Sequence, residues 1–166
     1  MSAADEVRIL LVDDDRTLLE YLSKRLQQYG FSVRATFSGE EALEVVINED
    51  FDVAVIDLKM PGMDGLETQR RLMEVLPELQ CIVLTAYGSI ESALKSGQLN
   101  AYDYLFKPVE YESLVVSIRG AHEKKRKLEQ IRKEQGEQAN LAPDGAGRGF
   151  KGMWRALRRI YGVTEQ

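Results

Sequence analysis

The stretch VIDLKMPGMDG, from Val55 to Gly65, decides the fold class of this chain. It starts as an apolar run that ends on the carboxylate of Asp57, and Pro61 and Gly62 lie in the segment that follows. An apolar run bounded by proline and glycine is typical of a strand that is buried on both faces of a parallel sheet. We therefore expect a buried strand, followed by a tight loop that exposes the side chain of Asp57.

Strands of this kind alternate with helical patterns over the first 120 residues. The expected strands are 7–12, 31–36, 52–57, 81–85 and 102–106. The expected helices are 13–30, 38–47, Asp64 to near Pro77, 89–97 and a last one from Glu110 or Tyr111 onward. Five strands that are each followed by a helix predict an α/β fold, with one open parallel sheet and helices on both faces. We expect the flavodoxin-like (βα)5 arrangement with strand order 2-1-3-4-5.

Ligands of such sheets bind beyond the carboxyl ends of the strands. In this topology five polar residues converge there, namely Asp13, Asp14, Asp57, Thr85 and Lys107. Three carboxylates at one place raise one another's pKa values unless a cation joins them. Mg²⁺ suits the position best, because it binds oxygen, needs few carboxylates and keeps several waters. The sequence therefore predicts a magnesium site at this edge of the sheet.

A magnesium site with open positions suits a phosphoryl group. Lys107 adds a second positive charge, and Thr85 offers a hydroxyl donor to a further phosphoryl oxygen. A carboxylate can attack phosphorus to give an acyl phosphate, and Asp57 is the candidate because it ends the central strand. The loop after Asp57 also turns backbone carbonyls, such as that of Lys59, towards the metal.

Four segments carry a family resemblance in their order and spacing: LLVDDD (10–15), DLKMPGMDG (57–65), LTAYGS (84–89) and AYDYLFKP (101–108). With them the chain resembles the receiver domain of two-component response regulators over roughly residues 7–120. The wording of the motifs is closest to receivers of nitrogen-regulation-type activators. Each motif alone is weak evidence, whereas the four together are highly specific.

The resemblance implies that Asp57 is the phosphoacceptor of a phosphorelay. It would take a phosphoryl group from a sensor histidine kinase or a phosphotransfer protein. Asp14, Asp57 and the backbone carbonyl of Lys59 would hold Mg²⁺, Asp13 would act largely through water, and Lys107 would contact the phosphoryl group. The protein would be no enzyme towards other substrates, since it would catalyse only its own phosphorylation and dephosphorylation.

The resemblance also implies a cis peptide between Lys107 and Pro108, and a switch. Thr85 would move towards the phosphate and Tyr104 would follow it inward, which would change the surface of the fourth helix, fifth strand and fifth helix. A new charge-assisted bond biases a bistable element in this way. The implied partner is a downstream protein target. The extended last helix further leads us to expect a phosphorylation-dependent homodimer, formed through the face of the fourth and fifth helices.

At several positions a purely structural role stays open as an alternative. The run Asp13–Asp15 is also typical of a helix N-cap cluster, in which Asp15 alone can serve as the cap. Thr85 also fits an ordinary strand residue, and Tyr104 an ordinary core residue. A rival of another class is an aspartyl-phosphate phosphatase with a similar open sheet. That class needs an Asp-x-Asp pair, and the second position here is Lys59, which counts against it.

The composition changes after residue 120. Residues 1–120 hold 11 Lys+Arg and 21 Asp+Glu, whereas residues 121–166 hold 11 and 6, so an acidic body precedes a basic tail. We expect a receiver domain at 1–120, a solvated helical extension of its last helix at 121–135, a flexible linker at 136–149 and a basic amphipathic segment at 150–166.

The basic segment leaves three interpretations open. It folds back onto the acidic receiver, it lies on an anionic membrane surface, or it meets nucleic acid or the groove of another protein. It is too short for a helix-turn-helix module, which disfavours sequence-specific DNA binding. A transcriptional regulator whose tail contacts DNA is the alternative to a receiver that acts through protein contacts.

Two further observations bound the class of protein. The apolar runs are too short to span a bilayer, and the N-terminus carries acids where a secretory signal needs bases, so we expect a cytoplasmic protein. The single cysteine, Cys81, lies in an apolar strand and is expected to be a buried structural thiol.

Overall fold

The structure, a computed structural model, describes residues 6–86 and 100–140, with side chains up to residue 136. The chain divides into two compact units, Met1–Glu129 and Gln130–Gln166. Three expected parts lie outside the described residues, namely the fourth helix at 89–97, the linker beyond residue 140 and the basic segment at 150–166.

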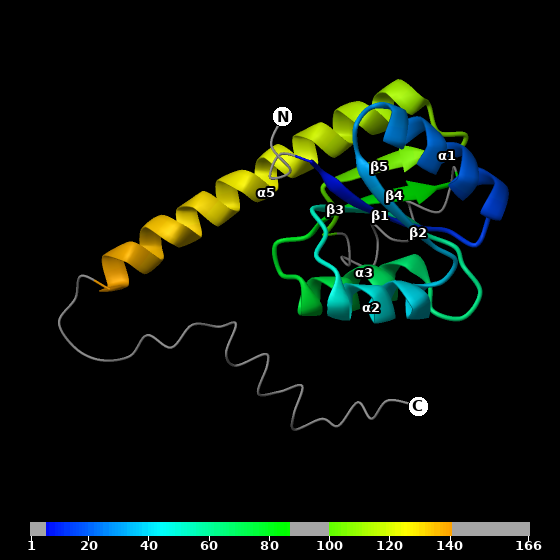
Figure 1. Cartoon of the computed structure of the whole chain (residues 1–166). Coiled ribbons are helices and arrows are strands. Elements are labelled where there is room, and N and C mark those ends of the chain that lie inside the picture. Colours follow the sequence, from blue (N-terminus) through cyan, green and yellow to red (C-terminus); the bar gives the residue numbers. More distant parts are fainter. Residues whose placement is uncertain (1–5, 87–99, 141–166) are drawn as a thin grey trace. The chain divides into compact units, whose positions relative to one another are not determined.

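The first unit is built on a five-stranded parallel sheet with strand order β2-β1-β3-β4-β5 (Figure 1). The strands are β1 (Arg8–Val12), β2 (Ser32–Thr36), β3 (Val53–Asp57), β4 (Gln80–Thr85) and β5 (Asp103–Phe106). This order confirms the flavodoxin-like topology expected from the sequence. Strands β3 and β4 are buried along their whole length, which explains why their sequences are continuous apolar runs.

The described helices are α1 (Arg16–Gln28), α2 (Gly39–Asn48), α3 (Gly65–Val75) and α5 (Tyr111–Asn140). The first three each begin at a side-chain cap, which is Asp15, Ser38 or Asp64. Such caps satisfy amide groups that the first helical turn leaves without a partner. Within residues 6–86 and 100–140, no helix is long and apolar enough to cross a membrane.

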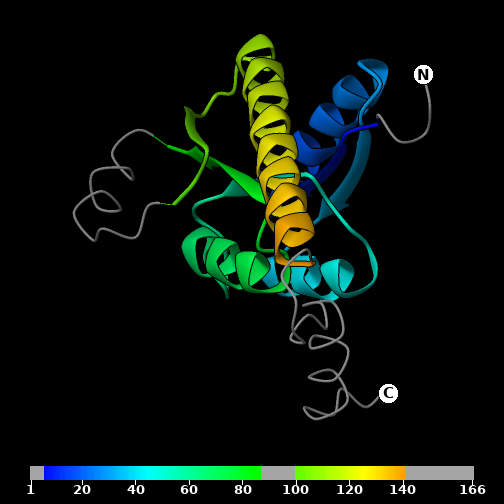
Figure 2. The ribbon, with the colours of Figure 1, turned by 90° about the vertical axis from the view of Figure 1, so that its left-hand side faces the viewer.

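The helices cover the two faces of the sheet and close two apolar cores. Helices α1 and α5 lie on one face, and α2 and α3 lie on the other (Figures 1 and 2). Side chains alternate between the two faces along each strand. Ile9 and Leu11 of β1 therefore enter the core on the side of α1 and α5, whereas Leu10 and Val12 enter the core on the side of α2 and α3. The cores include residues next to the carboxyl ends of the strands, such as Val12, Ile56 and Leu84, so apolar packing holds those ends in place.

Helix α5 corrects one expectation about the extension at 121–135. The sequence predicts a solvated extension after residue 120, but Ala121 and Lys125 are buried in the structure. They continue the buried stripe of Leu114 and Ile118 at helical spacing. The ammonium group of Lys125 is buried because it meets partners there: its Nζ lies 2.7 Å from Oδ1 of Asp52 and 3.0 Å from the carbonyl oxygen of Phe51.

Helix α5 also continues to Asn140, so residues 136–140 are helical where the sequence predicts a linker. That expectation rests on the glycine, proline and polar residues of 136–149, and Gly136 is the first of them. A single glycine costs a helix only about 1 kcal/mol relative to alanine, and the neighbouring glutamate and glutamine residues favour helix. Gly136 therefore does not end α5.

Cys81 lies in β4 with 1% of its surface exposed, which confirms the expected buried thiol. Burial raises the pKa of this thiol to about 12, so the reactive thiolate is scarce at neutral pH. We expect a thiol reagent at pH 8 to label the native protein very slowly, and one thiol per chain to react rapidly in concentrated urea. Rapid labelling without urea would contradict the burial of Cys81.

Candidate functional site

Parallel register brings the ends of four strands to one edge of the sheet. Val12 of β1 lies opposite Ile56 of β3, so the next residues along, Asp13 and Asp57, are neighbours. Asp57 lies opposite Leu84 of β4. At the edge of the sheet, Thr85 lies opposite Phe106, the residue before Lys107. The polar residues that follow or end these strands therefore meet at one place.

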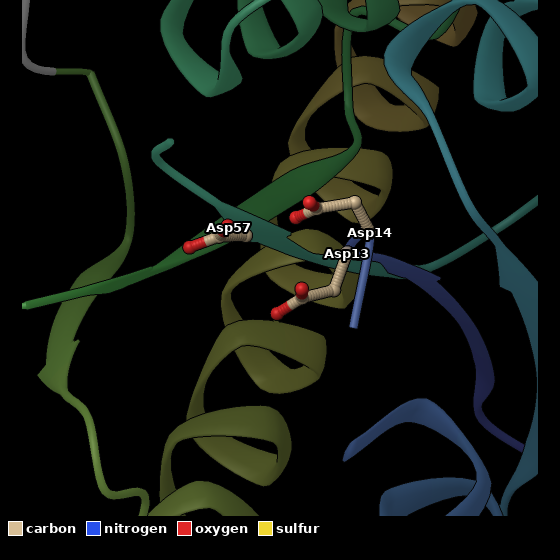
Figure 3. A group of neighbouring side chains, drawn as sticks. All are labelled: Asp13, Asp14 and Asp57. Carbon is tan, nitrogen blue, oxygen red and sulfur yellow. The ribbon is translucent and has the colours of Figure 1, made fainter. Parts of the chain in front are cut away.

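Three carboxylates gather at this edge, from Asp13, Asp14 and Asp57 (Figure 3). One oxygen from each side chain lies within 4.8 Å of the others. Asp13 and Asp57 are buried, with 2% and 6% of their surfaces exposed, whereas Asp14 is exposed. The cluster is thus built into the sheet on one side and open to solvent at Asp14.

Lys107 supplies the positive charge that faces the two buried carboxylates. Its Nζ lies 2.7 Å from Oδ2 of Asp13 and 3.1 Å from Oδ1 of Asp57. Burial lowers the pKa of the Lys107 ammonium, but the two carboxylates outweigh that effect and raise it. The expected cis peptide between Lys107 and Pro108 is confirmed.

Asp57 is an unusually placed carboxyl group. Burial raises its pKa, and the negative charge of Asp13 raises it further. The ammonium of Lys107 and the backbone amide of Lys59 lower the pKa again, without cancelling the rise. The ionised form of Asp57 is therefore costly in this cluster, and a further cation would stabilise it.

The loop after Asp57 is tight, as the sequence predicts, but the expectation that it exposes the Asp57 side chain is wrong, since only 6% of the surface of Asp57 is exposed. The amide of Leu58 donates to the carbonyl oxygen of Leu84 at 2.9 Å, and the amide of Gly65 donates to the carbonyl oxygen of Leu58 at 3.0 Å. Gly65 has to be glycine, because a Cβ there would clash with the backbone carbonyl oxygen of Asp57. These contacts fold the loop back on itself at the point where the acidic cluster lies.

The hydroxyl groups of Thr85 and Tyr104 form hydrogen bonds with partners other than Asp57. The hydroxyl of Thr85, which is buried, donates to the carbonyl oxygen of Ala86 at 3.1 Å. Tyr104 is half-buried, and its hydroxyl accepts from the amide of Ala101 at 3.1 Å. Tyr104 is thus only partly a core residue in this arrangement.

The N-cap alternative applies to Asp15 and not to the whole acidic run. Oδ1 of Asp15 accepts from the amide of Leu18 at 3.0 Å, which caps α1. Asp13 instead accepts from the amide of Asp15 at 2.9 Å and from Lys107. The carboxylate of Asp13 is thereby turned into the cluster.

The cluster fits a divalent cation such as Mg²⁺. All its negative ligands are carboxylate oxygens, which hard cations prefer, and Asp14 leaves one side open to water. Lys107 brings one positive charge to a group of three carboxylates, so negative charge remains to be neutralised. The donor set therefore matches the ion expected from the sequence.

Sequence reasoning missed Glu40, at the start of α2. Its Oε1 accepts from the backbone amide of Met63, in the loop that follows Asp57, at 3.1 Å. A glutamate in the first turn of a helix is common for electrostatic reasons alone. No motif marks the residue, and only the packing of α2 beside the loop reveals the contact.

A family model described as the response regulator receiver domain matches residues 9–119. The C4-dicarboxylate transport transcriptional regulatory protein DctD of Rhizobium meliloti is 39% identical over 126 residues, which are 76% of this chain and 27% of DctD. The transcriptional regulatory protein GlrR of Escherichia coli is 40% identical over 115 residues, 69% of this chain and 26% of GlrR. The chain thus spans about a quarter of the length of these relatives.

Solved structures agree with the sequence comparison. A receiver domain protein from Clostridium thermocellum matches with a TM-score of 0.68 and 30% identity, over 74% of this chain and 98% of that one. The response regulator TrrA from Thermotoga maritima, in complex with Mg²⁺ and BeF, matches with a TM-score of 0.62 and 31% identity, over 69% of this chain and 98% of TrrA. The fold, the acidic cluster and these relatives agree, and the chain belongs to the response regulator receiver domain family.

Proposed function

We propose that this chain receives a phosphoryl group on Asp57 and thereby switches a protein-interaction surface. The observation that carries the proposal is the convergence of Asp13, Asp14, Asp57 and Lys107 at the carboxyl edge of the sheet. A carboxylate oxygen of Asp57 attacks phosphorus, the P–N bond of a donor phosphohistidine breaks, and an acyl phosphate forms. The donor is a sensor histidine kinase or a phosphotransfer protein, in the cytoplasm.

The other residues of the cluster position and neutralise charge. Asp14, Asp57 and the carbonyl of Lys59 would hold Mg²⁺, with Asp13 acting largely through water. When bound, the ion supplies positive charge to the phosphoryl oxygens. Lys107, which already lies 3.1 Å from Asp57, is placed to contact the phosphoryl group from another side. TrrA, a relative of similar fold, is in complex with Mg²⁺ and BeF, which supports this assignment by analogy.

The output is a change of surface at β5 and α5. The hydroxyl of Thr85 leaves the Ala86 carbonyl for the phosphoryl oxygens, and Tyr104 gives up its contact with the Ala101 amide to turn inward. The phosphate supplies the energy as a charge-assisted hydrogen bond. The altered surface binds a downstream protein or a second phosphorylated copy of the chain.

The test is a mass measurement on the full chain. Incubation with acetyl phosphate and Mg²⁺ should add the mass of one phosphoryl group. Excess EDTA should prevent the addition, because the carboxylates then repel the incoming phosphate. A chain that takes up no phosphoryl group with Mg²⁺ present, or takes it up equally in EDTA, would contradict the proposal.

A further inference from the structure

We propose that Glu40, on α2, is a positioning residue for the phosphorylation site. This inference rests on the proposed function, and it adds a residue that lies outside the acidic cluster. Oε1 of Glu40 accepts a hydrogen bond from the amide of Met63 at 3.1 Å. A Cβ placed on Gly62 would lie 3.1 Å from the same oxygen, so the carboxylate lies against the peptide group between Gly62 and Met63.

The contact reaches the middle of the loop that joins Asp57 to α3. The two ends of this loop are held by backbone hydrogen bonds, at Leu58 and at Gly65. Between them Gly62 adopts a φ of +75°, a conformation that residues other than glycine rarely adopt. Directly after this turn, Glu40 accepts a hydrogen bond from the amide of Met63. This contact limits the rotation of the backbone in the middle of the loop.

Helix α2 holds Glu40 firmly enough for this task. Its first residue, Gly39, is packed so closely on α3 that a Cβ there would clash with Oγ1 of Thr68. Ser38 caps the helix by accepting from the amide of Glu41 at 3.1 Å. The side chain of Glu40 is exposed, but the backbone that carries it is fixed against both the loop and α3.

The loop matters to the reaction because of Lys59, which follows Asp57 by two residues. The backbone amide of Lys59 donates a hydrogen bond to the Asp57 carboxylate, which lowers the pKa of that group. The backbone carbonyl of Lys59 is the one backbone group assigned to the metal site. Both groups depend on how the loop backbone is turned. Glu40 therefore acts on the site through the loop, without touching a reacting atom.

The experiment compares Glu40→Ala, Glu40→Gln and wild type, with Glu44→Ala as the matched control. Glu44 is an exposed acid on the same helix, so its removal changes the charge of α2 without loss of the loop contact. Mg²⁺ affinity of the full chain is measured by calorimetry, and phosphorylation by acetyl phosphate is followed at several Mg²⁺ concentrations. Hydrogen exchange of the Met63 amide reports the contact itself.

We expect Glu40→Ala to weaken Mg²⁺ binding about fivefold, equivalent to one net hydrogen bond of about 1 kcal/mol. It should raise the Mg²⁺ concentration for half-maximal phosphorylation by a similar factor, leave the rate at saturating Mg²⁺ nearly unchanged, and speed exchange at Met63. Glu40→Gln keeps an acceptor oxygen and should restore most of the affinity. Glu44→Ala should behave as wild type.

Two results would overturn the inference. Glu40→Ala with wild-type Mg²⁺ affinity would show that the contact positions nothing. Glu40→Gln or Glu44→Ala as weak as Glu40→Ala would show that only the negative charge of α2 matters. In both cases phosphorylation of wild type still stands, whereas a wild type that takes up no phosphoryl group would refute the proposed function and this inference together.

Discussion

The Asp57→Asn variant is expected to take up no phosphoryl group from acetyl phosphate in the presence of Mg²⁺. The asparagine amide has nearly the shape of the carboxylate but cannot act as the nucleophile. It also removes one of the three negative charges that make the site attractive to a divalent cation. Intact mass spectrometry should show one added phosphoryl group on wild type and none on the variant.

The loss should not result from unfolding, and this can be checked independently. The folded-state pKa of Asp57 is raised by burial and by Asp13. The ionised group therefore costs stability above its unfolded pKa, and less as the pH falls and it becomes protonated. At neutral pH Asp57→Asn should be at least as stable as wild type in urea. Asp50→Asn, at an exposed aspartate, is the control and should be phosphorylated normally. An adduct on Asp57→Asn would refute the assignment.

The second large effect is expected from Lys125→Met, far from the phosphorylation site. Lys125 is buried beside Asp52, and removing the ammonium leaves a buried carboxylate without its main partner. Such a change costs roughly 3–5 kcal/mol. We expect about 3 kcal/mol, because the amide of Arg8 still donates to Asp52 at 2.8 Å. Urea unfolding of the full chain measures the difference, and the melting temperature should fall by about 10 °C.

Lys127→Met is the matched control on the same helix. Lys127 forms an exposed ion pair with Glu123 at 3.7 Å, which contributes little. Its replacement should change the free energy of unfolding by no more than about 0.5 kcal/mol. If Lys125→Met is as stable as Lys127→Met, then the buried ion pair does not hold α5 in place.

The pH dependence of stability provides an independent check on the ion pair. Burial alone would raise the pKa of Asp52, but the hydrogen bonds and charges of Lys125 and Arg8 outweigh it and lower the pKa. A lowered folded-state pKa stabilises the protein above the unfolded pKa of about 4, and this stability is lost as the pH falls through the folded value. The difference between wild type and Lys125→Met should therefore be full at pH 7 and shrink below pH 4.

The sequence predicts the sheet and the acidic cluster because local pattern and topology agree there. The run that ends in Asp57 predicts a buried central strand, and parallel register then brings Asp13 and Lys107 to the same edge. The order and spacing of the four motifs in addition indicate the protein family. These inferences need only the order of the helices and strands, and hydrophobic periodicity in the sequence indicates that order well.

The contacts of Lys125, Glu40 and Tyr104 could not be predicted from local sequence. Lys125 lies in a run of basic residues that is typical of a solvated helix, and it is buried only because Asp52, 73 residues earlier, lies beside it. Glu40 belongs to α2, which pairs with the loop through packing that no local pattern encodes. The hydrogen bond between the Tyr104 hydroxyl and the Ala101 amide depends on the side-chain rotamer of Tyr104, which strand periodicity does not determine.

Strand β3 carries charged contacts at both of its ends. Asp52, directly before the strand, is bound to Lys125, and Asp57, its last residue, is bound to Lys107. Apolar layers cover both faces between these two points, and close packing resists sliding of the strand along its axis. If Asp57 is phosphorylated as proposed, we therefore expect β3 to keep its position and the neighbouring segments that carry Thr85 and Lys107 to move instead.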